Sequence, residues 1–387
     1  MNKHIFIVAG DASGDVYGAQ LISALRKIDP DIQISGLGGD HMAASGMTFL
    51  YNLVREFSVM GFLPVILGMP KVMRFLEITL DYLDVHRPDA VVLIDYPGFN
   101  LYLATHTKPR KIPTIYYVTP QIWAWAPRRI NKIKRFITKM LVIFPFEVPF
   151  YEQAKVSVEY VGHPLLDRLA LFQADQNFCF NYQLTGGPML GLLPGSRRAE
   201  IRGNLPVMLW AASEMANQGA AMEDICIALA SYKYHALTDE ILQTCRKKFT
   251  LPEVKIIVGD TYNVLSHSHF VMVTSGTATL ETAMFGKPMV ICYRVPPLHK
   301  WVVEHTSFLK CKYFGLPNIV SGRKIVPEFL IAAPYPDYVV EAALPLCQAT
   351  ERRQQCLADL AQMQSLLKEP GASEKAAKAI WQTIVPL

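Results

Sequence analysis

The stretch Ser268–Arg294, SHFVMVTSGTATLETAMFGKPMVICYR, decides the fold that we expect for this chain. It contains an apolar run, Phe270–Val273, then a small polar turn, then a helical stretch, Ala278–Phe285. A Gly-Lys-Pro sequence ends the helix, and a second apolar run, Met289–Cys292, follows it. The order strand, turn, helix, turn, strand is the repeating unit of an α/β protein with a parallel sheet.

The polar turn in this stretch, Ser275-Gly276-Thr277, predicts a site for an anion. It places unpaired amide groups and a helix N-terminus at the carboxyl end of a strand, and both favour negative charge. Glu281 is expected in the first turn of the helix, where its carboxylate would cap the helix or accept hydrogen bonds from sugar hydroxyls. An ordinary helix cap in an α/β domain is the alternative explanation of these residues.

Length and composition restrict the class of protein. The 387 residues suggest two domains, and 51% hydrophobic with 18% charged residues indicate large cores. We find no apolar run of about 18 residues that would predict a transmembrane helix, and the N-terminus resembles a strand and its turn, not a signal peptide.

Seven cysteines without CxxC spacing favour a reducing cytoplasm. The net charge of +5 fits an acidic substrate or an anionic membrane and is too small to indicate nucleic-acid binding.

Polar residues follow two of the strands expected in the first half. The first strand leads into a turn that extends to Asp15, in which Asp11 and Ser13 are capable helix caps. This turn lacks the GxGxxG pattern and does not support a dinucleotide site. The apolar strand Ala90–Ile94 leads into Asp95. An acidic residue at that position points to the edge of the sheet where α/β proteins bind ligands, or it caps the next helix.

The second half repeats the alternation of strand and helix, so we expect two similar α/β halves that face each other across a cleft. A basic glycine turn that contains Arg197 and ends at Arg198 follows the strand Met189–Leu193, and a helix is expected from Arg202 to about Gln218. A forked guanidinium and the helix N-terminus after Ser275 would together suit a diphosphate. His163, in a turn before proline, either is structural or lines the cleft. The expected parts are domains 1–168 and 185–345, a linker within Leu169–Gly187 and closing helices over 346–387, which pack on the first domain or on a partner in a homodimer.

The segment Val54–Met73 is unusually apolar, and prolines and a glycine interrupt any long helix in it. A core helix would normally show a polar face. Packing in a core is one explanation, and an exposed patch that meets lipid is the other. A basic segment, Arg128–Lys139, is either a solvated helix face or a surface for anionic lipid or phosphate. The residues that would contact acyl chains or the membrane are Met60, Phe62, Leu63, Val65, Ile66 and Leu67.

No metal or cofactor is expected. The sequence contains no GxxxxGK[ST], GxSxG or HExxH pattern. His267-Ser268-His269 has no acidic or thiol cluster near it in the sequence, so it does not predict a metal site. A diphosphate leaving group would then be neutralised by amides and arginine instead of Mg²⁺.

Taken together, these segments resemble the lipid-A-disaccharide synthase family over nearly the whole chain. Single motifs are weak, but their order and spacing are specific. The matching blocks are Val8–Asp15, Gly38-Gly39 with Met42, Val59–Gly61, Ile94–Asn100, Pro120–Trp125, Pro145–Glu147 with Phe150-Tyr151, Val161–His163, Leu193–Arg197 with Glu200, Ser275–Glu281, Pro288–Val290 with Tyr293-Arg294, Leu316–Asn318 and Pro327–Phe329.

The resemblance implies a GT-B fold and an inverting, metal-independent glycosyltransferase at the cytoplasmic face of the inner membrane. The implied reaction joins UDP-2,3-diacylglucosamine to 2,3-diacylglucosamine 1-phosphate (lipid X) by a β-1,6 bond and releases UDP. The position of Asp95 would be the general base for the acceptor's 6-hydroxyl. The residues that would bind substrate are Arg197, Ser275, Gly276, Thr277 and Glu281 at the UDP, Asn318 near the nucleotide, and Asp11, Ser13, His163 and Tyr293.

Three positions depart from the family's pattern. Asp11 stands where Glu is typical, which shortens the side chain by one methylene. Ala126-Pro127 intervenes before Arg128, where the family has arginine directly after its Trp-Ala-Trp triplet. Ile331 stands where Gln or a similar residue is usual.

Two other classes of function remain open on the sequence. One is a different GT-B enzyme, either a transferase with another lipid acceptor or a UDP-sugar epimerase. An epimerase would not explain the apolar segment. The other is a catalytically inactive membrane-surface protein that binds nucleotide-sugar. The presence of Asp95, Arg197 and Glu281 argues against it.

Overall fold

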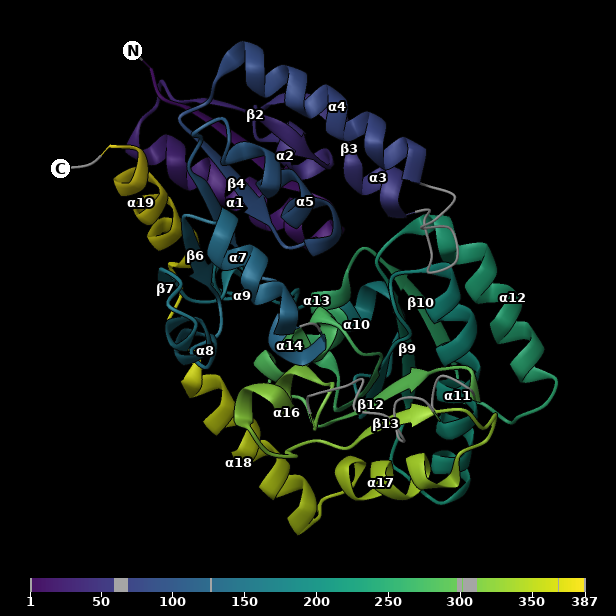
Figure 1. Ribbon diagram of the computed structural model, residues 1–387. Coiled ribbons are helices and arrows are strands. Elements are labelled where there is room, and N and C mark those ends of the chain that lie inside the picture. Colours follow the sequence, from purple (N-terminus) through teal and green to yellow (C-terminus); the bar gives the residue numbers. More distant parts are fainter. Residues whose placement is uncertain are drawn as a thin grey trace. The chain divides into compact units, whose positions relative to one another are not determined.

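The computed structural model describes residues 2–58, 69–125, 127–297, 301, 312–367 and 369–385. The chain forms two compact units. The first contains Met1–Leu171 and Leu367–Leu387, and the second contains Phe172–Leu366. Each unit is built on one parallel sheet covered by helices (Figure 1). The chain therefore leaves the first unit once and returns to it with its last helix.

The sheet of the first unit has seven strands in the order β3-β2-β1-β4-β5-β6-β7. All its neighbouring strands are parallel. The central strands are short apolar runs because both of their faces are buried. The strands are β1 (His4–Ala9), β2 (Gln33–Gly38), β3 (Thr48–Asn52), β4 (Ala90–Ile94), β5 (Thr114–Tyr117), β6 (Lys139–Val142) and β7 (Val158–Tyr160).

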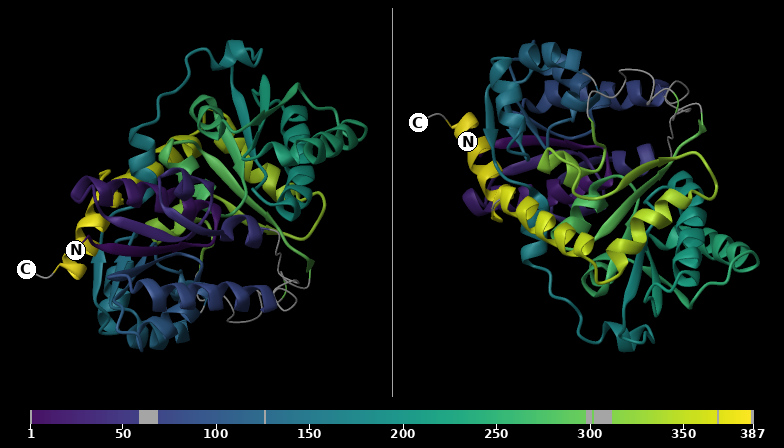
Figure 2. Two further views of the ribbon diagram at one scale, coloured as in Figure 1. Left: turned by 90° about the horizontal axis from the view of Figure 1, so that it is seen from above. Right: turned by 90° about the horizontal axis from the view of Figure 1, so that it is seen from below.

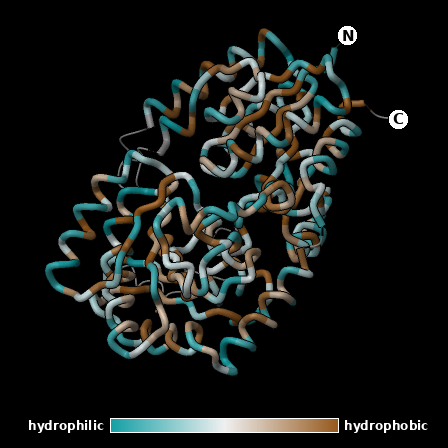
Figure 3. The backbone as a smooth tube through the Cα atoms, turned by 180° about the vertical axis from the view of Figure 1, so that it is seen from behind, coloured by the Kyte–Doolittle hydropathy of each residue, from teal (hydrophilic) through white to brown (hydrophobic). Residues whose placement is uncertain are grey.

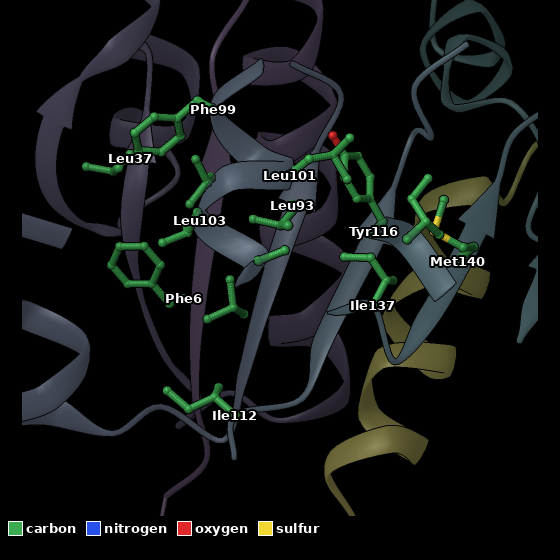
Figure 4. Close-up of a cluster of buried hydrophobic side chains, with 14 of the residues drawn as sticks. Phe6, Leu37, Leu93, Phe99, Leu101, Leu103, Ile112, Tyr116, Ile137 and Met140 are labelled. Atoms are coloured by element: carbon green, nitrogen blue, oxygen red, sulfur yellow. The ribbon is translucent and has the colours of Figure 1, made fainter. Parts of the chain in front are cut away.

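Helices pack on this sheet through apolar side chains. Figure 4 shows Phe99, Leu101 and Leu103 of one helix lying against Phe6 and Leu93 of the strands. The helices are α1 (Ala12–Ile28), α2 (Asp40–Ala44), α3 (Leu53–Ser58), α4 (Met69–His86), α5 (Pro97–Thr107), α6 (Ile122–Trp125), η2 (Pro127–Arg129), α7 (Ile130–Phe136), α8 (Glu147–Gln153), α9 (Pro164–Ala170) and α19 (Ala372–Ile384).

The second unit repeats the arrangement with six strands in the order β10-β9-β8-β11-β12-β13. Its strands are β8 (Met189–Leu193), β9 (Asp224–Leu229), β10 (Val254–Val258), β11 (Phe270–Val273), β12 (Met289–Arg294) and β13 (Glu328–Ile331). Its helices are α10 (Phe178–Asn181), α11 (Arg198–Asn217), η3 (Tyr232–Tyr234), α12 (His235–Arg246), α13 (Thr261–His267), α14 (Thr277–Met284), α16 (Leu316–Ser321), α17 (Asp337–Cys347) and α18 (Glu351–Leu366). In Figure 3 hydrophobic segments gather inside each unit, as buried parallel sheets require.

The closing helices are divided between the units. α17 and α18 pack on each other in the second unit, whereas α19 packs on α1 and α9 of the first (Figure 2). Asp167 of α9 accepts hydrogen bonds of 2.5 to 3.0 Å from the N–H groups of Gly371, Ala372 and Ser373. This carboxylate satisfies the free amides at the N-terminus of α19 and fixes the helix to the first unit.

Strand order identifies one topological switch point in each sheet. In the first unit the chain order reverses between β1 and β4, and in the second between β8 and β11. In open α/β sheets ligands bind outside the carboxyl ends of the strands at such points. Asp11 and Asp95 follow the first pair of strands, and Arg197 and Ser275 follow the second. The fold thus brings sequence-predicted residues to the expected edge of each sheet.

Two expectations about local structure were wrong. The turn expected as far as Asp15 is shorter, because α1 begins at Ala12 with Asp11 as its N-cap. The helix of the second unit that was expected from Arg202 begins four residues earlier, at Arg198. In both places the first turn of the helix consists mostly of polar residues, and a carboxylate caps it. Such residues are also typical of loops, so the sequence does not show where the helix begins. Among the described helices, none has the length and hydropathy needed to cross a membrane.

Candidate active site

Three strained residues mark the carboxyl ends of β4 and β5. Asp95, Tyr96 and Val118 have φ angles of 43°, 45° and 54°. Side chains other than glycine rarely adopt such values, and a β-branched valine is a clear outlier. Strained backbone of this kind clusters at active sites, where the surrounding structure enforces it.

The backbone around Asp95 is held from both sides. Its N–H donates to the carbonyl of Val118 at 3.1 Å. Its carbonyl accepts from the Tyr116 hydroxyl at 2.6 Å and from the Asn100 amide at 2.7 Å. The N-cap of α5 is Tyr96, not Asp95, so the alternative role of Asp95 as a helix cap is wrong. Its carboxylate accepts a hydrogen bond from the Tyr96 backbone N–H.

Three carboxyl groups gather at this edge of the sheet. Burial and the charges of Asp11 and Glu147 raise the pKa of Asp95 to about 7. Asp11 caps α1 by accepting from the N–H of Gly14 at 2.8 Å, and it also accepts from the Ser13 hydroxyl at 2.9 Å. A carboxyl group whose pKa lies near 7 is a stronger base than an ordinary aspartate, and about half of it is ionised at neutral pH.

Glu147 is a buried carboxyl group that the sequence did not identify as a site residue. It accepts from the Thr119 hydroxyl at 2.9 Å, the Trp123 indole N–H at 3.2 Å and the Phe144 N–H at 3.1 Å. Burial raises the pKa of Glu147 to about 7. The only signal in the sequence was its place in the Pro-Phe-Glu block after a strand.

The pH dependence of turnover follows from these charges. If Asp95 is the base, only its ionised form is active, so kcat/KM should rise about tenfold per pH unit below about 7 and then level off. Asp11→Asn keeps a good helix cap but removes a negative charge that raises the pKa of Asp95. The acidic limb should therefore move to lower pH in this variant. A pH–rate profile of both proteins tests this, and an unmoved limb would exclude Asp95 as the titrating group.

In the second unit the turn after β11 forms an open helix N-terminus. Gly276 has a φ of 139° and is the N-cap of α14, whose first amides receive no cap from a side chain in the part of the chain that the structure describes. A Cβ at Gly276 would meet nothing within 4 Å. Ser275 lies in this turn directly before Gly276, and Thr277 is the first residue of the helix. Unpaired amides with open space in front of them suit an oxygen-rich anion.

Glu281 is not in the first turn of its helix. α14 begins at Thr277, so Glu281 is its fifth residue, and the expected capping role is wrong. Its carboxylate accepts from the Tyr262 hydroxyl at 3.0 Å. This hydrogen bond orients the carboxylate and leaves acceptor capacity for sugar hydroxyls.

The helix N-terminus after β8 is already occupied. Glu200 accepts from the N–H groups of Ser196 and Arg197 at 2.9 and 3.2 Å. Its other oxygen forms an ion pair with the Arg197 guanidinium at 2.9 Å, although the Arg197 side chain is 69% exposed. Burial and the charge of Glu200 raise the pKa of Tyr293, which places this phenol near the pair. α11 therefore offers a guanidinium to a ligand, and α14 offers free amides.

Two predicted substrate contacts have side chains that bond within the protein. Asn318 is fully buried, and its side chain bonds to the N–H groups of Ile325 and Val326, the Val326 carbonyl and the Glu328 carboxylate. No donor or acceptor of this amide remains for a nucleotide. His163 is buried and caps α9 by accepting from the Leu165 N–H, and burial lowers its pKa to about 3. For His163 the structural alternative is the one that the geometry supports.

The other sequence-based expectations have mixed outcomes. Ile331 is buried at the end of β13, opposite Arg294. His269 bonds to the Cys347 carbonyl, and the described residues contain no group of three potential metal ligands. Ala126 and the predicted membrane contacts lie outside the described residues; these contacts are Met60, Phe62, Leu63, Val65, Ile66 and Leu67.

Solved structures with 13% sequence identity share the fold of this chain. The S. aureus MnaA–UDP co-structure matches with a TM-score of 0.68 and covers 100% of this chain and 98% of that chain. MurG of Acinetobacter baumannii matches with a TM-score of 0.57, covering 98% and 99%. UDP-N-acetylglucosamine 2-epimerase from Listeria monocytogenes matches with a TM-score of 0.64, covering 99% and 96%. The two parallel sheets are thus those of the GT-B fold.

Sequence comparison gives the family. The lipid-A-disaccharide synthase of Myxococcus xanthus is 35% identical over 385 residues, which cover 99% of this chain and 98% of that protein. The same enzyme of Syntrophus aciditrophicus is 36% identical over 381 residues, covering 97% and 96%. The family model described as lipid-A-disaccharide synthetase matches residues 5–383. With the two switch-point sites described above, these matches show that the chain belongs to the lipid-A-disaccharide synthase family of glycosyltransferases.

Proposed function

We propose that this enzyme transfers 2,3-diacylglucosamine from UDP to the 6-hydroxyl of 2,3-diacylglucosamine 1-phosphate. The Asp95 carboxylate takes the hydroxyl proton, and the oxygen attacks the anomeric carbon of the donor. The bond from that carbon to UDP breaks, and its electron pair leaves with the diphosphate. Attack opposite the leaving group inverts the anomeric carbon and gives the β-1,6 disaccharide 1-phosphate.

The observation that carries this proposal is the strained turn at Asp95. Two successive left-handed residues and three backbone hydrogen bonds hold the carboxylate at a topological switch point. Strain there is difficult to explain by stability alone, because each such residue costs about 1–3 kcal/mol. A base with a pKa near 7 also fits the removal of a sugar hydroxyl proton at neutral pH.

The second unit would bind the UDP. The free amides of α14 and the exposed Arg197 guanidinium suit the two phosphates, and Glu281 suits a sugar hydroxyl. When the diphosphate binds, Arg197 would exchange its single bond to Glu200 for charge-assisted bonds to phosphate. The leaving group would then be neutralised by protein groups as the glycosidic bond breaks.

Both substrates carry acyl chains, so we propose that the enzyme binds peripherally to the cytoplasmic face of the inner membrane. Exposed cations on η2 and α7 suit anionic headgroups; they are Arg128, Arg129, Lys132, Lys134 and Arg135. The apolar segment from Met60 to Leu67 would meet the lipid. A homodimer is a further part of the proposal.

The test is release of UDP by the purified protein with diacylated UDP-glucosamine, measured with and without lipid X in detergent. We expect release only with lipid X and a β-1,6 disaccharide 1-phosphate as the product. Conversion of the donor to an epimer, or its hydrolysis without acceptor, would instead assign the epimerase or hydrolase chemistry of other GT-B proteins. UDP binding without any turnover would point to a different acceptor.

A further inference from the structure

One buried amide in the second unit connects the ends of three neighbouring strands. Asn204 is the seventh residue of α11 and is only 2% exposed. Its Nδ2 donates to the Pro194 carbonyl at 3.1 Å and to the Thr274 hydroxyl at 2.8 Å. Its Oδ1 accepts from the Arg294 N–H at 2.7 Å. These partners lie at the carboxyl ends of β8, β11 and β12, which are adjacent in the sheet.

Two of the three partners adjoin segments assigned above to UDP binding, and the third adjoins Tyr293, a predicted substrate contact. Pro194 begins the loop that carries Arg197. Thr274 comes directly before the turn that opens α14, and Arg294 directly follows Tyr293. The Asn204 side chain therefore forms a hydrogen bond next to each of these three segments.

The sheet alone does not align these segments. The pairing of β11 stops at Val273, which lies opposite Leu193 on one side and Ile291 on the other. Beyond that level the Thr274 N–H still donates to the Leu193 carbonyl at 2.9 Å, and β12 continues to pair with β13 as far as Arg294, but β11 and β12 are no longer paired with each other. Asn204 connects the ends of β8, β11 and β12 at the level where the backbone hydrogen bonds between β11 and β12 have stopped.

Helix α11 can lie close to the strand ends because the residue before Asn204 is a glycine. A Cβ placed at Gly203 would lie 3.3 Å from the Cβ of Arg294, which is tighter than most such contacts. Glycine there allows α11 to lie close to β12. The primary amide of Asn204 can then donate twice and accept once at the same time, which neither a carboxylate nor a hydroxyl can do.

We propose that Asn204 is a positioning residue for the donor diphosphate. It touches no substrate itself; it holds the Arg197 loop, the α14 turn and the end of β12 at the spacing that the two phosphates require. Misplacement of such groups weakens binding without removing any contact residue. This inference rests on the proposed assignment of UDP to the second unit.

The experiment measures affinity for UDP and for uridine by titration calorimetry with wild-type protein, Asn204→Ala and Asn204→Asp. Asn204→Ala leaves three groups without their partner, whereas Asn204→Asp keeps the acceptor for the Arg294 N–H and loses the two donated bonds to Pro194 and Thr274. Loss of these buried hydrogen bonds should weaken UDP binding by about tenfold or more in both variants. Uridine lacks the phosphates, so its affinity should change much less. The KM for the donor should rise more than kcat falls.

Ser213→Ala is the matched control, because Ser213 is buried on the same helix and its hydroxyl donates to the Thr250 carbonyl at 2.8 Å. It should lower the melting temperature without changing the ratio of UDP to uridine affinity. Thr274→Val removes one partner from the opposite side and should reproduce part of the effect even if the Asn204 variants do not fold.

Unchanged UDP affinity in folded variants, or an equal loss for UDP and uridine, would reduce Asn204 to a purely structural role. Failure of wild-type protein to bind UDP is a different result. It would refute the assigned donor site itself and the inference with it.

Discussion

Asp95→Asn is expected to lower kcat by about 10²–10⁴-fold, the usual contribution of a general base. The amide cannot take the proton from the acceptor hydroxyl. UDP affinity should be retained, because the predicted UDP contacts belong to the other unit. Measurement of single-turnover rates together with UDP titration separates the two effects.

The asparagine variant is well suited to this position. Asn tolerates the left-handed backbone better than most residues, so the φ of 43° at this turn adds little strain. The hydrogen bonds that hold the turn use the backbone of residue 95 and survive the change. Asp31→Asn, an exposed change in the same unit, is the control. Full turnover by Asp95→Asn would show that another group removes the proton.

Asp15→Ala is expected to lower the free energy of unfolding by about 3 kcal/mol, because buried N–H groups left without an acceptor cost about 1–3 kcal/mol each. The Asp15 carboxylate is 3% exposed and accepts from the N–H groups of Gly39, His41 and Met42 at 2.8 to 3.0 Å. It thereby joins the first turn of α1 to the start of α2. Urea denaturation monitored by circular dichroism measures the loss.

Asp15→Asn, compared with Asp15→Ala, shows how much each carboxylate oxygen contributes to stability. Its remaining oxygen can still serve Gly39 and Met42, which share one carboxylate oxygen, but not His41. We expect an intermediate loss of stability. Asp31→Ala, on the surface, should stay within about 0.5 kcal/mol of wild type. Equal stability of Asp15→Ala and wild type would mean that water replaces the carboxylate.

Buried strands were the most predictable part of the fold. The ranges expected for β4, β8 and β11 agree with the observed ones, because strands buried on both faces appear as continuous apolar runs between polar turns. Asp95 could be placed for the same reason, since it comes directly after such a run. Helix starts were less predictable. One residue of error at the start of α14 moved Glu281 from its second turn to its first.

Residues whose role depends on distant partners could not be predicted. Asn204 lies inside a helix, and nothing in its neighbours reveals that it bonds to residues 70 and 90 positions away. Glu147 was visible only as part of a short block, although its partner Thr119 is 28 residues earlier. Asn318 was assigned to the nucleotide by family resemblance, while its own bonds go to the loop that follows it. Such roles emerge only when tertiary packing brings the groups together.

The return of α19 to the first unit has a consequence for synthesis on the ribosome. Residues 172–366 form a continuous unit that can fold as it emerges. The first unit must wait for α19, whose N-terminus satisfies the Asp167 carboxylate. At usual rates of translation about 200 further residues take roughly 10–40 s. During that interval the surface of α1 and α9 that α19 will cover is exposed, so the nascent first half is a natural client for chaperones.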